Sequence, residues 1–177
     1  MEKMKNLEQL IKERRSIKKY KSDAVPKELI EKVIEAGLYA ASGRGTQCPK
    51  IIAITDKKMR DKVSKANCEI GGYSEGVDPF YNAPVILLVI VPKDNPTGVY
   101  DGSVVLGNMM LMAHNLGLGS CWIHRAKEEM DSPLGEEISK TINLSEKYIG
   151  VGHLALGYAN TELLPPPARK NDRVFWI

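Results

Sequence analysis

Hydrophobic residues near the start of the chain recur every three or four positions, a spacing that is typical of amphipathic helices. Leu7, Leu10 and Ile11 predict a short helix that ends near Arg14. A second helix is predicted over residues 26–41, because its initial proline is compatible with the first turn of a helix. Its expected buried stripe is Leu29, Ile30, Val33, Ile34, Gly37 and Leu38.

Shorter apolar runs predict strands, and polar segments between them predict helices. Buried strands are expected at 51–55, 85–91, 121–124 and 148–156. The run over 85–91 is continuous and rich in β-branched residues, so we expect it in the middle of a sheet, buried on both faces. Helices are expected over 57–66 and, with an interruption near Pro133, over 126–143.

One predicted helix is apolar nearly all round. It is expected to start at Asp101, a plausible N-cap, and to end near Leu118. Its apolar residues are Val104, Val105, Leu106, Met109, Met110, Leu111, Met112, Ala113 and Leu116. A small domain can cover one face of such a helix but seldom every face. We therefore expect part of this helix to pack on a second copy of the chain, in a homodimer.

Two segments are expected to lack regular structure. Residues 67–83 contain glycines, a proline and the aromatic residues Tyr73, Phe80 and Tyr81, and an irregular segment of that length is usually functional or mobile. Residues 163–177 contain three consecutive prolines, which exclude a helix there. Because this tail ends on apolar residues, we expect it to dock on another surface.

Composition narrows the class of protein. A chain of 177 residues is long enough for one domain, 1–177, but short for two. A net charge of +3, without aromatic residues interleaved among basic ones, argues against a nucleic-acid partner. No apolar run reaches membrane-spanning length, and the charged residues 1–5 argue against a signal peptide. Three widely spaced cysteines favour neither disulfides nor structural zinc, so we expect a cytoplasmic protein with no membrane partner.

The basic residues concentrate between Arg14 and Lys21, where five of them surround Ser16. Two guanidiniums, several ammonium groups and a hydroxyl suit a compact phosphate better than an extended polyanion. The alternative is a run of solvated charges at a helix end, where cations also interact favourably with the helix dipole.

A glycine-containing loop over residues 42–47 is a second candidate, because its backbone could approach a flat polar ligand closely. It lacks the lysine of a P-loop and the spacing of a dinucleotide-binding turn. A helix C-cap followed by a turn explains the same residues equally well.

The remaining candidate groups favour structural roles. Cys121 lies in an apolar strand and is interpreted as a buried thiol. His114 and His153 are interpreted as core or interface residues, whereas His124 and Arg125 either anchor an anion or mark the end of a strand. No catalytic triad, paired carboxylates or metal-ligand spacing is recognisable, so a cofactor is expected to supply the chemistry.

Taken together, five segments resemble the FMN-dependent nitroreductase family. In chain order they are R-R-S-I-K-K-Y (14–20), A-A-S-G-R-G-T-Q (40–47), D-G-S-V-V-L-G-N-M (101–109), G-L-G-S-C-W-I (117–123) and G-Y…P-P-A-R-K (157–170). The resemblance implies an α+β, nitroreductase-like fold with a central, mostly antiparallel sheet flanked by helices. It also implies a homodimer whose swapped C-terminal tails, 163–177, embrace the partner and whose two FMN sites lie at the interface.

The resemblance implies a set of cofactor-binding residues. The phosphate, ribityl chain and pyrimidine edge of FMN would be held by Arg14, Arg15, Ser16 and Lys18. The other subunit would contribute Ser42, Gly43 and Gln47. The ring would lie along Cys121, Trp122 and Ile123, and Arg169 would return to the phosphate.

The sequence departs from the common family pattern in three places. Gly45-Thr46 replaces an asparagine-containing segment, and Cys48-Pro49-Lys50 replaces a proline-aromatic pair. The acidic, glycine-containing loop that longer relatives place near flavin N5 is not recognisable, so the N5 hydrogen-bond donor is not identified.

The function implied by the resemblance is hydride transfer from NADH or NADPH, followed by reduction of a small planar acceptor such as a nitroaromatic compound or a quinone, in a ping-pong mechanism. Two alternatives from other classes remain. One is a flavin-binding sensor or storage protein without efficient turnover, and the other is a phosphate-binding interaction module without flavin.

Overall fold

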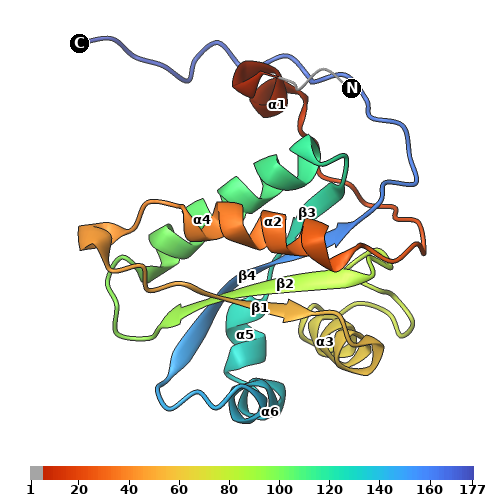
Figure 1. Ribbon diagram of the computed structural model, residues 1–177, viewed down its shortest axis with the longest axis vertical. Helices are drawn as coiled ribbons and strands as arrows, with labels where there is room; N and C mark the ends of the chain where they lie inside the picture. Colours follow the sequence, from red (N-terminus) through yellow and green to blue (C-terminus); the bar gives the residue numbers. More distant parts are fainter. Residues whose placement is uncertain (1–5) are drawn as a thin grey trace.

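The computed structural model describes residues 6–177, which form an α+β fold with a four-stranded sheet between helices (Figure 1). The strands are β1 (Lys50–Ile54), β2 (Val85–Pro92), β3 (Gly119–Ile123) and β4 (Tyr148–Gly157). Their order is β1-β2-β4-β3, and all neighbouring strands are antiparallel, which confirms the predicted fold class. Residues 1–5, on which the expectation of no signal peptide rests, lie outside the described residues.

The helices form a layer on each face of the sheet. They are α1 (Leu7–Glu13), α2 (Lys27–Leu38), α3 (Lys57–Ile70), α4 (Gly98–Asn115), α5 (Ala126–Met130) and α6 (Pro133–Thr141), with a 3-10 turn η1 (Gly43–Gly45). Figure 1 shows α2 and α4 on one face and α3, α5 and α6 on the other. The predicted interruption near Pro133 is confirmed, because Ser132 caps α6 and proline occupies its first turn.

The sheet has a hydrophobic core on each face, and strand β2 contributes to both, as its continuous apolar sequence predicts. All residues from Val85 to Val91 are buried, and β2 pairs with β1 on one side and β4 on the other. Ile86, Leu88 and Ile90 belong to the core under α3, α5 and α6, whereas the alternate residues belong to the core under α2 and α4. Each fully buried aliphatic side chain contributes roughly 1.5–3 kcal/mol.

Two burial predictions are wrong at the periphery of the fold. In β1 only Ile54 is buried, because β1 is an edge strand and not a central one. Leu38, predicted in the buried stripe of α2, is 60% exposed, whereas Ile30, Val33 and Gly37 are buried as expected. Leu38 is the last residue of α2, and its side chain is exposed although the neighbouring Gly37 packs against Ile51 of β1.

Helix α4 begins before the predicted position. Its N-cap is Thr97, so Asp101 is not the N-cap but a buried residue within the first turns of the helix. A side chain at Gly102 would place its Cβ 2.7 Å from Val151, so this glycine permits α4 to lie directly on β4.

Large apolar side chains remain exposed on one side of the molecule. Helix α4 exposes Val99, Tyr100 and Val104, the end of α2 exposes Leu38 and Tyr39, and α1 exposes Leu7 and Ile11. The C-terminal tail is extended, as predicted, but within the described residues of one chain it docks on nothing, and Phe175 and Trp176 are both more than 80% accessible. Figure 1 shows α1 and the tail on the same side as α2 and α4, away from the sheet.

None of the helices within residues 6–177 is both long and apolar enough to cross a membrane.

Candidate functional site

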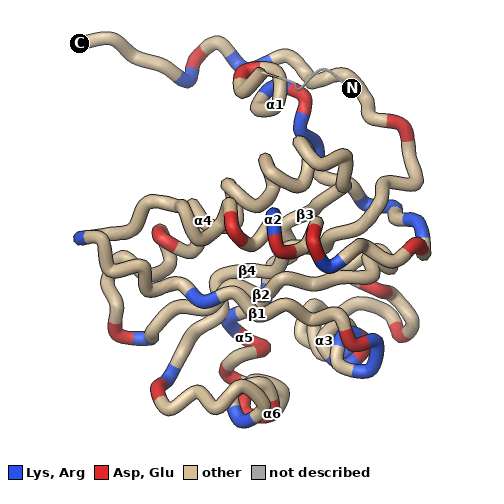
Figure 2. Tube along the Cα trace, in the orientation of Figure 1, with Lys and Arg blue, Asp and Glu red and all other residues tan. Residues whose placement is uncertain are grey.

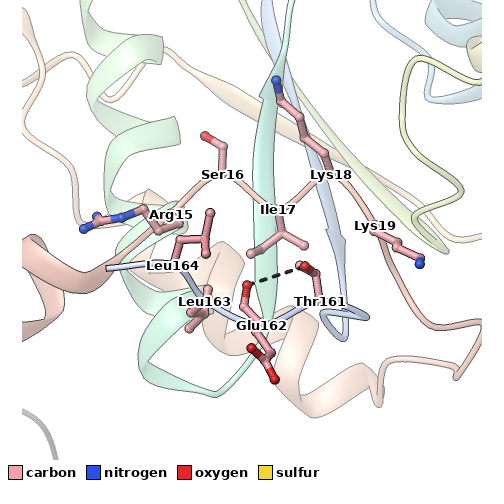
Figure 3. Close-up of a pocket in the computed structure, with 9 residues that line it drawn as sticks. All are labelled: Arg15, Ser16, Ile17, Lys18, Lys19, Thr161, Glu162, Leu163 and Leu164. Atoms are coloured by element: carbon pink, nitrogen blue, oxygen red, sulfur yellow. Dashed lines mark hydrogen bonds between the residues drawn. The ribbon is translucent and has the colours of Figure 1, made fainter. Parts of the chain in front are cut away.

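The basic segment after α1 adds an extended stretch to the free edge of β3. Ser16 forms a parallel bridge with Ser120, and the Ile17 amide donates to the Ser120 carbonyl at 3.0 Å. Ile17 is buried against Gly119, where a Cβ would lie only 2.8 Å from the isoleucine side chain. Because side chains alternate in an extended segment, Ser16 and Lys18 point away from the core, as Figure 3 shows.

The two arginines of this segment are half-buried, and part of their hydrogen-bonding capacity is unused. Nη1 of Arg14 and Nε and Nη2 of Arg15 are shielded from solvent without a hydrogen-bond partner among the described residues. Burial and the neighbouring charge of Arg15 both lower the pKa of Arg14. Charged groups in this state are costly unless an anion binds them, so a phosphate fits here better than the alternative of solvated charges.

Cys121 lies beside this segment and is a buried thiol, as predicted. Its exposed fraction is 5%, and burial raises its pKa. The Ser16 hydroxyl and the positive charges of Lys18 and Arg14 oppose that rise in part, which places all three groups near the sulfur. The structure thus brings together four residues that the sequence predicted as one site.

The rest of β3 alternates between the two faces of the sheet. Cys121 and Ile123 belong to the core under α5, whereas Trp122 packs on the α4 side, where its indole would contact a Cβ at Gly152 at 2.6 Å. The three side chains therefore cannot all face one ligand. Trp122 lies two residues after Ser120 in β3, and backbone groups two residues apart point to the same edge of a strand. The backbone N–H and C=O of Trp122 therefore point to the free edge at which the Ser120 carbonyl binds Ile17.

A groove of about 690 Å³ lies along the basic segment. It is lined by Arg15, Ser16, Ile17, Lys18 and Lys19 on one side and by Thr161, Glu162, Leu163 and Leu164 on the other (Figure 3). This volume lies in the range of small-molecule and cofactor pockets. Figure 2 shows Lys and Arg clustered along the chain between α1 and α2, so the groove carries a positive wall.

The loop between α2 and β1 is held by α4. The Gly43 amide donates to Oδ1 of Asp101 at 2.9 Å, and the Thr97 hydroxyl donates to Oδ2 at 3.0 Å. The backbone amide of Gln47 donates to Oγ of Ser42 at 2.9 Å, which joins the two ends of the loop. A Cβ at Gly43 would lie 2.4 Å from the Thr97 hydroxyl, so the close approach requires glycine.

Within one chain, the predicted site residues form two separate groups. Figure 1 shows η1, which contains Gly43, at the opposite end of α2 from the segment that follows α1. Ser42 and Gln47 belong to the η1 group, and Arg169 lies in the exposed tail. One chain therefore does not bring Ser42, Gly43 and Gln47 to the basic segment.

Sequence reasoning missed two contributors to these groups. The sequence predicts Asp101 as an N-cap, but its carboxylate instead holds the loop at η1. The signal for this role was that Asp101 is a single acidic residue beside a long apolar run. Residues 161–164, which line the groove, carry no recognisable motif and approach the basic segment only because β4 ends beside it.

The buried histidine of β4 has a structural partner. His153 Nε2 lies 2.9 Å from Glu129 Oε2, and both side chains are at most 1% exposed. Asn67 donates from Nδ2 to Oε1 of Glu129 at 2.5 Å and to the His124 carbonyl at 2.8 Å. His153 is therefore a core residue, as predicted. No group of three potential metal ligands is found in the described part of the chain.

Comparison with known proteins identifies relatives over most of the chain. The profile described as the nitroreductase family matches residues 11–71 and 73–158. A relative from Methanothermobacter thermautotrophicus, named as an NADH dehydrogenase/NAD(P)H nitroreductase, is 30% identical over 154 residues, which are 84% of this chain and 74% of the relative.

Solved structures with the same fold include two flavoproteins. A nitroreductase with bound FMN from Bacteroides fragilis superimposes with a TM-score of 0.85 at 25% identity, over 98% of this chain and 100% of that one. An FMN-dependent nitroreductase from Clostridium difficile gives a TM-score of 0.78 at 28% identity, over 96% of this chain and 98% of that one. Both the fold and the sequence match extend across the two groups of candidate residues, and the chain belongs to the nitroreductase family.

Proposed function

We propose that this protein is a homodimeric FMN-dependent oxidoreductase, which takes hydride from NADH or NADPH and reduces a small planar acceptor such as a nitroaromatic compound or a quinone. The observation that carries this proposal is the pair of half-buried arginines whose shielded nitrogen atoms lack acceptors. Family membership and the FMN named for two structural relatives support the same cofactor.

The residues of the basic segment would hold the phosphate end and one edge of FMN. Arg14 and Arg15 supply forked donors for the phosphate, and Ser16 supplies a hydroxyl on the same exposed side as Lys18. Lys18 would lie near the part of the ring that becomes negative on reduction, and would therefore favour the reduced form. The free backbone edge at Trp122 offers donors and acceptors to the polar rim of the ring.

When bound, FMN would supply the redox chemistry that connects hydride donation by the nicotinamide to reduction of the acceptor. No side chain of the described site is needed as a strong acid or base. The buried thiol of Cys121 has a raised pKa, so it stays protonated at neutral pH and does not add a negative charge beside the ring. Donor and acceptor would use the same site in turn, which gives ping-pong kinetics.

The proposal includes a second subunit because one chain leaves the site divided. Ser42, Gly43 and Gln47 would reach the flavin from the partner, and the tail over 163–177, including Arg169, would cross to embrace it. The exposed apolar residues of α4 and α2 supply a surface for this contact, and the exposed apolar end of the tail supplies another. Residues 1–177 would thus act as one domain per subunit.

Purification tests the cofactor and the reaction directly. The protein, expressed with sufficient flavin, should be yellow, and NADH or NADPH should bleach its visible band when oxygen is absent. Reoxidation by a nitroaromatic compound or a quinone should restore the band, and double-reciprocal plots at several acceptor concentrations should be parallel.

The same experiment separates the other classes of function. A colourless protein that takes up no FMN contradicts the proposal, and binding of inorganic phosphate alone would then favour a phosphate-binding module. A yellow protein that is reduced only slowly, and whose visible band no acceptor restores, would favour a flavin sensor or storage protein. Comparison of the initial rates with NADH and NADPH identifies the preferred donor.

A further inference from the structure

The irregular segment between α3 and β2 is fixed by one carboxylate. Oδ1 of Asp78 accepts hydrogen bonds from the Ser64 hydroxyl at 2.7 Å and from the Phe80 amide at 2.9 Å. Oδ2 accepts a hydrogen bond from the backbone amide of Asn82 at 2.8 Å and forms an ion pair with Arg60. The prediction of an irregular segment over 67–83 is confirmed from residue 71 onward, whereas 67–70 belong to α3, which is longer than predicted. The half of the segment that contains Asp78 is tied to α3 through this largely buried carboxylate.

Arg60 completes the link between this segment and the core. Its side chain is 10% exposed, and Nε donates to the Ala83 carbonyl at 3.0 Å while Nη2 pairs with Asp78. Phe80 is fully buried and packs edge-on against His153 with ring centroids 5.2 Å apart. The chain on both sides of Tyr81 is therefore anchored.

Tyr81 adopts a backbone conformation that is unfavourable for an aromatic residue. Its φ is 56°, and the following residue, Asn82, has φ of 60°. Bulky side chains rarely occupy the left-handed region, and such conformations persist only where the surroundings impose them. The hydrogen bonds of Asp78 to the amides on either side of Tyr81 are that constraint.

The imposed conformation places the Tyr81 ring beside the basic segment. Nζ of Lys18 lies 5.9 Å from the centroid of the ring, within the range of a cation–π interaction. Lys18 is otherwise exposed, and its long flexible stem would sample many rotamers. The face of a half-buried ring restricts where the ammonium group can go.

We infer that Tyr81 is a positioning residue for Lys18, and that the Asp78–Arg60 pair holds the tyrosine in this role. The inference rests on the proposed function, because Lys18 acts on the negative charge of reduced FMN. With its ammonium group restricted by the ring, Lys18 stabilises reduced FMN more than a freely moving lysine would. The potential of the bound flavin is thus set partly from the segment that the sequence predicts to be irregular and either functional or mobile.

The test is the midpoint potential of bound FMN, measured by dye-coupled titration in four proteins: wild type, Tyr81→Gly, Lys18→Ala and the double variant. Glycine removes the ring and also favours φ of 56°, so the backbone is relieved of strain. Tyr81→Gly should weaken the relative binding of reduced FMN about threefold to tenfold, which lowers a two-electron potential by about 14 to 30 mV. Lys18→Ala should lower the midpoint potential further, and the double variant should have the same potential as Lys18→Ala.

Two variants control for indirect effects. Asn82→Gly relieves the neighbouring strained residue without removing the ring, and Tyr148→Leu removes a similar contact, in which Lys50 Nζ lies 5.7 Å from the ring. Both should leave the potential unchanged. Unfolding curves for each variant separate a loss of stability from a change in potential.

The outcomes distinguish the inference from the proposed function. Absence of FMN binding by the wild type would defeat the proposed function. Normal binding with equal potentials in wild type and Tyr81→Gly would overturn the role of Tyr81. Additive shifts in the double variant would show that the tyrosine acts without Lys18, which also contradicts the inference.

Discussion

At the scale of single residues, Arg14 and Arg15 combine a positive charge, partial burial and unpartnered nitrogen atoms. Side chains in this state usually mark a binding site, because a purely structural arginine finds acceptors within the protein. Their adjacency in sequence was visible from the start, but whether they were solvated depended on their burial beside β3.

Arg14→Ala should weaken binding of FMN by roughly 10- to 100-fold, because a hydrogen bond to a charged group contributes about 1.5–3 kcal/mol. The stability of the protein without cofactor should be unchanged or higher, since the variant removes a desolvated charge beside Arg15. Fluorescence titration of FMN and thermal unfolding of the cofactor-free protein check the two parts. Equal FMN affinity in the variant and the wild type would argue against a phosphate site here.

Asp78 should make stability depend on pH in the acidic range. Burial alone raises its pKa, but hydrogen bonds from Ser64, Arg60 and the Phe80 amide outweigh burial, so the folded pKa lies below the usual value. The charged form is thus stabilised by folding, and its contribution is present above about pH 4, the value of an unfolded aspartate. It is lost as the pH falls through the folded pKa.

Urea unfolding at pH 7 and near pH 3 measures this effect. At pH 7 the free energy of unfolding should be larger for the wild type than for Asp78→Asn. The difference between the two proteins should be smaller near pH 3. Asp94→Asn, at an exposed position, provides the control and should show no such narrowing. A gap that is constant with pH would mean that the charge of Asp78 does not contribute.

At the scale of elements, the loop at η1 depends on α4 for its shape. Asp101 accepts from the Gly43 amide and the Thr97 hydroxyl, so one side chain connects the start of α4 to the loop that follows α2. Sequence patterns predicted where both elements lie and placed the acid within a turn of the helix start. They could not show that its partner is 58 residues away in the chain.

Asp101→Ala should destabilise the protein by about 1–3 kcal/mol, because it leaves the partly buried backbone amide of Gly43 without its acceptor. It should also reduce FMN affinity if the loop contributes to the site of the other subunit. Asp94→Ala, in the exposed turn before α4, is the matched control and should change neither quantity. Denaturant unfolding and FMN titration are the measurements, and an undisturbed Asp101→Ala protein would show that the loop holds its shape without α4.

At the scale of the whole molecule, the exposed apolar side chains of α4, α2 and the tail are hard to reconcile with an isolated chain. The nearly uniform apolar character of α4 predicted this arrangement, because the sheet can cover only one side of a helix. The structure adds which large apolar residues of α4 remain exposed, namely Val99, Tyr100 and Val104.

Val104→Arg should weaken the proposed dimer by roughly 1–3 kcal/mol, since a charged side chain would be buried without a partner. Sedimentation velocity over a range of concentrations should show more monomer, and FMN binding should fall with the dimer. Ile142→Arg, on the opposite face of the sheet, alters a similarly exposed apolar residue and should leave the dimer intact. Dimers of equal stability in both variants would exclude this face of α4 from the contact.

The amino-acid sequence alone determined the local features of this protein. Apolar periodicity located the strands and most helices, and the basic segment, the glycine-containing loop and the proline-rich tail were recognisable as segments. These features depend on residues close together in the chain, where backbone preferences and side-chain spacing act directly.

Only the tertiary structure decided which of these features meet. It placed β1 at an edge, brought Ser16 to Ser120, linked Asp101 to Gly43, and held Tyr81 beside Lys18. Each of these contacts joins residues that are far apart in the chain, and their energies depend on burial and on the exact approach of two elements. No local pattern encodes that geometry, because it results from the packing of the whole sheet and its two helical layers.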